Sequence, residues 1–174
     1  MFKTTFSTPQ DDILTRAIDN GCAFNFNIAA SQIPAGGAIL YRFNTLDLPE
    51  FVYSRILKST VERAEYEVYV EPVLTGTITE VPIEPRWLNG IVNPGRLPKM
   101  TCHRLDGAVF VSGTQIVGDI SGAPEMDARR ILDYYTEFYV LLKNTTGGNT
   151  VSSFQLIMIE LLDSKYPPAP PVAP

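Results

Sequence analysis

The sequence contains little of what metal sites and covalent catalysis usually require. Its 174 residues include one histidine, His103, and two cysteines, Cys22 and Cys102. Cys102 and His103 are consecutive, so an extended strand would direct them to opposite faces, and no other histidine or cysteine completes a zinc set. A Ser-His-Asp triad could use only His103, and the Gly-x-Ser-x-Gly nucleophile turn is absent. We therefore expect no metal site, no cofactor and no catalytic residue, and predict that the protein is not an enzyme.

Basic residues are also few. The chain has 14 Lys+Arg against 19 Asp+Glu, which gives a formal net charge of -5 at pH 7. This acidic balance, with no basic run, argues against nucleic acid or an anionic membrane as the main partner. Neither Gly36-Gly37 nor Gly147-Gly148 lies in a phosphate-binding motif.

Long apolar runs are missing as well. No stretch approaches the roughly 18 apolar residues of a transmembrane helix. The N-terminal Met-Phe-Lys-Thr-Thr-Phe has no apolar segment long enough for a signal peptide. We therefore expect synthesis in a host cytoplasm, where Cys22 and Cys102 would remain two buried free thiols rather than a disulfide.

What the chain does contain is enough apolar sequence for one folded domain, with 45% hydrophobic and 19% charged residues. The stretch from Arg63 to Gly76 shows the pattern best. Alternation places Tyr66, Val68 and Val70 on one face of a strand, and Glu65, Glu67, Tyr69 and Glu71 on the other. Apolar and polar faces that alternate in this way predict an antiparallel strand with one face on the core and a solvated row of glutamates on the other.

Similar signals recur along the chain. Asp11 or Asp12 caps a short predicted helix that ends before Gly21. Segment 125–135 fits neither a helix nor a strand clearly. Strands are predicted at 22–28, 38–43, 51–57 and 100–117, a hairpin at 138–143 and 151–160 around 144–150, and loops at 33–37, 75–98 and 118–124. Many short strands between Gly/Pro turns predict an all-β fold, an antiparallel β-sandwich or jelly roll with a short N-terminal helix and extended arms.

The domain boundaries follow from composition. Residues 1–12 form a polar N-terminal arm, 13–163 a single β-sandwich domain, and 164–174 a Pro-rich tail that favours polyproline II. In the arm, Phe2 and Phe6 either fray or serve as apolar anchors ordered by a neighbouring molecule. The long segment Thr75–Pro98 holds the only tryptophan, Trp87, which is either an interface residue or a plug over its own core.

Three pieces of the sequence resemble small virion proteins of tailed bacteriophages. They are Ile18-Asp-Asn-Gly-Cys-Ala-Phe24, Tyr66-Glu-Val-Tyr-Val-Glu-Pro72 and Tyr139-Val-Leu-Leu-Lys-Asn-Thr-Thr-Gly-Gly-Asn-Thr-Val151, and the likeness covers roughly residues 15–162. The family looks like the capsid decoration, or cement, proteins, which have β-sandwich or jelly-roll folds and attach as oligomers outside the shell. In that family the segment matching Arg129–Leu132 is a strand. This chain departs from the pattern in lacking a histidine before Asp19 and in its long Pro85–Pro98 loop.

The resemblance implies a structural role on the virion surface. The expected partners are the major capsid protein and further copies of this chain, as a homodimer or homotrimer. We place the contacts at Phe2, Phe6, Trp87 and Ile91, on the arm and the long loop.

Two rival functions stay open. The alternative is a tail or head-fibre module that binds host-surface glycans, because jelly rolls also serve as lectins and Trp87, Tyr134 and Tyr135 could stack on sugars. The second rival is an enzyme, a small depolymerase, since some pair among the acidic residues could meet the geometry of a glycosidase.

Overall fold

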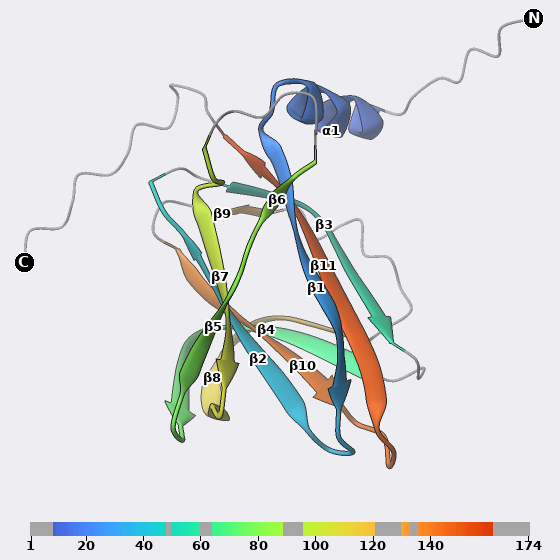
Figure 1. Ribbon diagram of the computed structural model, residues 1–174, viewed down its shortest axis with the longest axis vertical. Coiled ribbons are helices and arrows are strands. Elements are labelled where there is room, and N and C mark those ends of the chain that lie inside the picture. The colour runs from blue at the N-terminus through green and yellow to red at the C-terminus, as the bar shows by residue number, and fades with distance from the viewer. Residues whose placement is uncertain are drawn as a thin grey trace, which may run out of the picture.

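The computed structural model describes residues 9–47, 50–59, 64–88, 96–120, 130–132 and 136–161 (Figure 1). A single helix, α1 (Pro9–Asp19), precedes the strands in this described part of the chain. The strands are β1 (Ala23–Ile33), β2 (Ala38–Thr45), β3 (Glu50–Ser59), β4 (Ala64–Thr75), β5 (Thr79–Ile83), β6 (Arg86–Trp87), β7 (Met100–Asp106), β8 (Val109–Ile120), β9 (Arg130–Leu132), β10 (Glu137–Asn144) and β11 (Thr150–Glu160). None of the described helices is long and apolar enough to cross a membrane.

The strands form two antiparallel sheets that pack face to face, as predicted. Within the described residues, one sheet has the order β6-β1-β11-β3-β9 and the other β5-β7-β2-β10-β4-β8. If β5, β6 and β7 are set aside, the orders become β1-β11-β3-β9 and β2-β10-β4-β8. Every connection between these strands then crosses from one sheet to the other, except that from β4 to β8. This is the strand order of a jelly roll.

The predicted C-terminal hairpin is wrong in its pairing. Strands occur at both positions, but β10 pairs with β2 and β4, whereas β11 pairs with β1 and β3 in the opposite sheet. The loop between them therefore arches across the sandwich. Asn144 holds this arch, because its buried side-chain amide donates hydrogen bonds to the carbonyl oxygens of Ile33, Pro34 and Gly148.

The long loop predicted at 75–98 is only partly irregular. It contains β5 and β6, and with β7 it forms an insertion between β4 and β8 that widens both sheets. β7 pairs with β2 and β5 with β7, while β6 pairs with β1. The predicted strand 100–117 is likewise two strands, β7 and β8, joined at Gly107, and β8 runs on to Ile120, into the predicted loop 118–124.

The main core lies between the two sheets and is rich in aromatic rings. Phe43 stacks on Phe138, and Phe26 meets Phe43 edge to face. The expected inward residues Val68 and Val70 pack in this core. Cys102 is buried there as well, and both cysteines are free thiols. The predicted burial holds for Cys102 but not for Cys22, which is half-buried.

The other face of the second sheet is not the solvated face that the glutamates predict. Tyr69 is only 7% exposed and packs with Leu40, Leu105, Tyr139 and Leu141, which form a second apolar cluster. Leu74, Ala108 and Phe110 pack against this cluster. The end of the β4–β8 pair where Leu74 lies opposite Phe110 therefore covers the outer face of its own sheet. The backbone changes direction at Glu71, which has a positive φ of 51°, immediately before Pro72.

Helix α1 closes one end of the sandwich (Figure 1). It ends at Asp19, before Gly21 as predicted, and Gly21 has a φ of 66°. It begins at Pro9, so the predicted caps Asp11 and Asp12 lie inside the helix, and residues 9–12 of the predicted arm belong to it. The amide of Gly21 bonds to the carbonyl of Ile18 and that of Cys22 to the carbonyl of Ala17, the pattern of a Schellman cap. Strand β9 confirms the strand that the family resemblance implies at 129–132; most of the ambiguous segment 125–135 lies outside the described residues.

Candidate functional site

Of the four residues predicted as contacts, Trp87 alone lies in the described part of the chain, and Phe2, Phe6 and Ile91 lie outside it. Trp87 in β6 is half-buried and meets Phe24 edge to face, with ring centroids 5.8 Å apart. Its indole Nε1 donates a hydrogen bond of 2.8 Å to the carbonyl oxygen of Arg96. The Arg96 guanidinium lies over the ring, 5.3 Å from its centroid. Trp87 therefore covers the apolar core of its own sandwich, which is the second of the two roles predicted for it.

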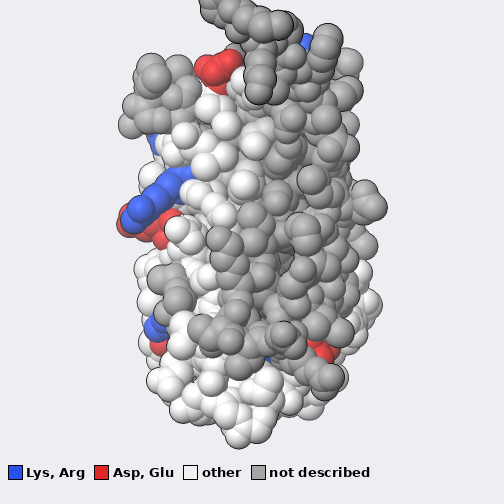
Figure 2. Space-filling model, turned by 90° about the vertical axis from the view of Figure 1, so that its right-hand side faces the viewer, with Lys and Arg blue, Asp and Glu red and all other residues white. Residues whose placement is uncertain are grey.

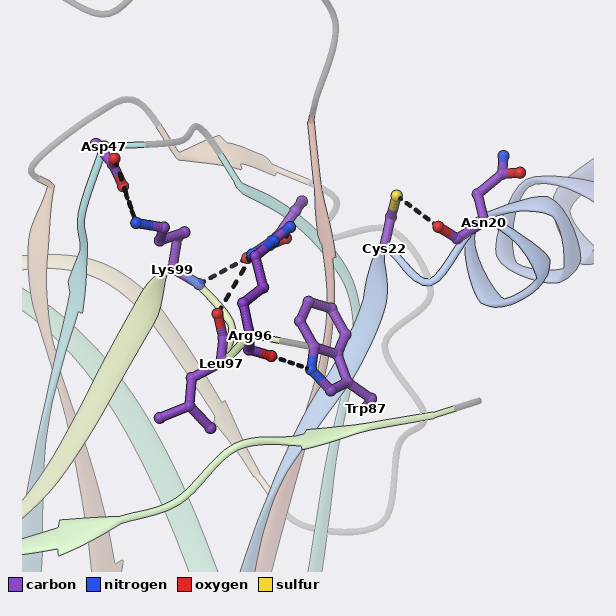
Figure 3. A network of polar contacts seen from close by, with 8 residues as sticks. Asn20, Cys22, Asp47, Trp87, Arg96, Leu97 and Lys99 are labelled. Carbon is purple, nitrogen blue, oxygen red and sulfur yellow. Dashed lines mark hydrogen bonds and ion pairs between the residues drawn. The ribbon is translucent and has the colours of Figure 1, made fainter. Parts of the chain in front are cut away.

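Arg96 also belongs to a polar cluster at this end of the sandwich (Figure 3). Its guanidinium binds both carboxylate oxygens of Glu160, the last residue of β11. The backbone amide of Lys99 donates a further hydrogen bond of 2.6 Å to Glu160 Oε1. These contacts join the segment before β7 to the end of β11, so the inserted strands are fixed to the sandwich at both sheets.

Glu50 lies beside this ion pair, opposite Glu160 in the pairing of β3 with β11. It is fully buried, and neither carboxyl oxygen has a hydrogen-bond partner among the described residues. Burial, and then the negative charge of Glu160, raise the pKa of Glu50 to about 9, although Arg96 opposes the shift. The Glu50 carboxyl is therefore neutral at pH 7, and only Glu160 of the two faces Arg96 as an anion.

The polar groups of Arg96, Lys99 and Glu160 in this cluster bind mainly to one another. Arg96 is already bound by Glu160 and Trp87, and the described residues contain no group of three His, Cys, Asp or Glu side chains placed to hold a metal ion. Burial, followed by the charge of Glu160, also raises the pKa of the nearby Cys22 thiol, which disfavours the reactive thiolate. What the cluster can do is clamp the insertion and respond to the protonation of Glu50.

A different kind of site lies where the end of β4 pairs with the start of β8. Leu74 and Phe110 are paired across the two strands and point inward to the second apolar cluster. Their neighbours alternate outward, so Val73 is 52% exposed and Val109 and Val111 are each 57% exposed. With Ile78, which is 40% exposed, these residues form what we call the valine surface.

A groove of about 410 Å³ adjoins the valine surface on the outside of the second sheet. Most of its lining residues are apolar in type, but polar and apolar atoms contribute about equally to its exposed surface. The one charged side chain among them, Lys143, forms an ion pair with Glu67. The lining residues are Ala38, Leu40, Ala108, Val109, Phe110, Leu141 and Lys143. Sequence reasoning assigned Val109 and Val111 to a strand but missed their exposure. The Val-Phe-Val alternation at 109–111 is the signal that marks them.

Among the described residues, charge is sparse on the side of the molecule that Figure 2 shows. The described basic and acidic side chains there are few, and several lie as neighbours of opposite sign. The described part of this face therefore presents no continuous basic patch of the kind that binds nucleic acid.

The chain was compared with known proteins at three levels. No protein-family model matches it, and it matches no curated protein and no solved structure.

Proposed function

We propose that this protein is a structural component of a virion, which decorates and stabilises the outside of a bacteriophage capsid by bridging capsid subunits. The jelly-roll strand order supports this, because the architecture is common in viral capsid and lectin domains. That support is an analogy between folds, and many functions share this fold. The virion-protein motifs at residues 18–24, 66–72 and 139–151 favour the capsid role within it.

The observation that carries the proposal is the valine surface. Three valines more than half exposed, beside a groove of mixed polar and apolar surface, form the kind of patch that marks protein–protein contact sites. The backbone that carries these valines is held in place, because Leu74 of β4 and Phe110 of β8 pack against the second apolar cluster. A rigid apolar surface of this kind suits a protein that binds another folded surface and needs no chemistry. On this proposal Val73 contacts the capsid, and Phe2, Phe6 and Ile91 remain predicted additional contacts.

The test is co-sedimentation of the protein with expanded capsid shells of the parent virion that lack it, with unexpanded precursor shells as the control. We expect saturable binding to expanded shells alone. Val73→Lys should weaken that binding about tenfold or more, because a lysine ammonium must be desolvated at an apolar contact.

Val151→Lys is the matched control, because Val151 is an exposed valine on β11, in the opposite sheet. It should bind as the wild type does. Absence of binding to expanded shells would contradict the decoration role, and equal weakening by both lysines would exclude the valine surface as the contact.

The glycan-binding alternative stays a prediction. One side of the Trp87 ring carries the Arg96 guanidinium, and Phe24 packs against the same indole, so a sugar would have to displace existing contacts. Tyr134 and Tyr135 lie outside the described residues.

A further inference from the structure

The outer strands of the two sheets differ in how well they are protected against pairing with another chain. Within the described residues, the outer strands are β6 and β9 of one sheet and β5 and β8 of the other. β6 has 2 residues and β9 has 3, which is too short to offer a ladder. β5 carries Glu80 and Pro82, a charge and a residue that cannot donate a backbone hydrogen bond. Short length, charge and proline are the usual protections of edge strands.

The first half of β8 lacks charge and proline, although register shifts at Val70/Val73 and Val73/Leu74 interrupt its ladder with β4. β8 is 12 residues long, and this first half is Val109–Thr114. From Val111 to Thr114 every residue is exposed. β4 pairs with one side of β8, and the sheet ends at the other side. An exposed, uncharged segment at the edge of a sheet is a template for another strand.

We propose that the edge of β8 at Val109–Thr114 pairs antiparallel with the same edge of a second copy of this chain, so that the two sheets become one continuous sheet. We assign the partner as a second copy because this segment can pair with itself. A strand that pairs with its own copy about a two-fold axis brings its own side chains opposite each other, so they must not repel. The segment Val-Phe-Val-Ser-Gly-Thr brings no like charges together. A pairing with β5 of another copy would instead meet Pro82 and lose a ladder hydrogen bond.

This pairing has a consequence for the valine surface. Val109 and Val111 point outward from β8, away from the second apolar cluster that Phe110 packs against. A two-fold pairing would place the two copies of this apolar face in one plane, and so double the surface offered to a third partner. The dimer itself does not depend on the proposed capsid role, and it is tested without any shell.

The experiment is sedimentation velocity of the full chain over a concentration series, at about 0.15 M salt to screen the net negative charge of each copy. We expect a dimer for the wild type. Val111→Lys places a positive charge on each of the two facing strands and should weaken association about tenfold or more.

Val73→Lys is the matched control, because Val73 is 52% exposed on β4, which lies on the paired side of β8 and away from the free edge of β8. It should sediment as the wild-type dimer. A monomeric wild type, or a dimer that withstands Val111→Lys, would overturn the proposal. Equal loss of dimer in both variants would also overturn it, because the interface would then be the valine surface and not the edge.

Amide hydrogen exchange gives a second measurement, which needs no variant to fold. Exchange at residues 109–114 should slow as the wild-type concentration rises through the range in which the dimer forms, because new ladder hydrogen bonds protect these amides. Thr114→Lys serves as a second edge variant if Val111→Lys does not fold. Exchange at 109–114 that does not change with concentration would contradict the pairing.

Discussion

Glu50→Gln should remove a large part of the pH dependence of the free energy of unfolding. The Glu50 carboxyl is fully buried beside Glu160, and its pKa is raised from 4.5 to about 9, chiefly by burial. The folded protein therefore keeps this proton across the neutral range, whereas the unfolded chain releases it. Folding at neutral pH must take up a proton at this one residue.

The sign and the magnitude follow from linkage. Because the folded-state pKa lies above the unfolded-state value, the stabilisation is complete below 4.5 and is lost as the pH rises toward 9. One bound proton changes the free energy of unfolding by about 1.4 kcal/mol per pH unit. The wild type should therefore lose about 4 kcal/mol between about pH 5 and pH 8 through this group. Glutamine has a similar shape and no proton to release, so the variant should lack this slope.

Urea unfolding of both proteins at several pH values is the assay. The difference in slope is the quantity to compare, because a buried glutamine amide also changes the absolute stability. Glu84→Gln, at an exposed position, controls for the loss of one negative charge and should keep the wild-type slope. Parallel curves for the wild type and Glu50→Gln would refute the claim that Glu50 is protonated in the folded protein.

Two further predictions concern the turns, and both are read from urea midpoints. Asn144→Ala should lower the free energy of unfolding by about 3 kcal/mol, because the arch loses the hydrogen bonds that the buried amide donates to the carbonyl oxygens of Ile33, Pro34 and Gly148; a loss under about 1 kcal/mol would show that water replaces the amide. Gly107→Ala should cost about 2 kcal/mol or more, because Gly107 has a φ of 78° and a Cβ there would lie 2.3 Å from the Thr77 carbonyl oxygen. Gly147→Ala, with open space around the new Cβ, should be nearly neutral, and equal losses at the two glycines would contradict this account of the turn.

The fold class followed from the sequence because alternation with a period of two is local. The Tyr66–Val70 pattern gave the inward face of β4 correctly, since Val68 and Val70 lie in the core. It missed that Tyr69 is also buried, because the outer face is covered by residues far along the chain, such as Leu105 and Phe110. No periodicity within one strand records what a distant segment places over it.

The pairing of the last two strands shows a second limit. Gly and Asn residues between two apolar segments suit a hairpin and an arch between sheets equally well. The continuous burial of Phe138–Leu142 is the feature that distinguishes them, because a strand covered on both faces is central in its sheet. The run Phe-Tyr-Val-Leu-Leu was visible in the sequence and would have argued against a simple hairpin.

The polar cluster and the free edge of β8 could not be predicted from the sequence. Arg96 and Glu160 are separated by 64 positions in the chain, and Glu50 meets Glu160 only through the register of β3 with β11. Neither partnership leaves a local signal. The absence of charge from Val109–Thr114 is plain in the sequence, but it acquires meaning only when the sheet order places β8 at an edge.

The most direct test of the proposed role measures the shell itself. DNA-filled capsids that lack this protein would be heated with and without saturating amounts of it, and the temperature at which DNA is released would be recorded. Capsid decoration predicts a higher release temperature with the wild type and a smaller rise with Val73→Lys at the same concentration. An unchanged release temperature on shells that have bound the wild-type protein would contradict a stabilising role.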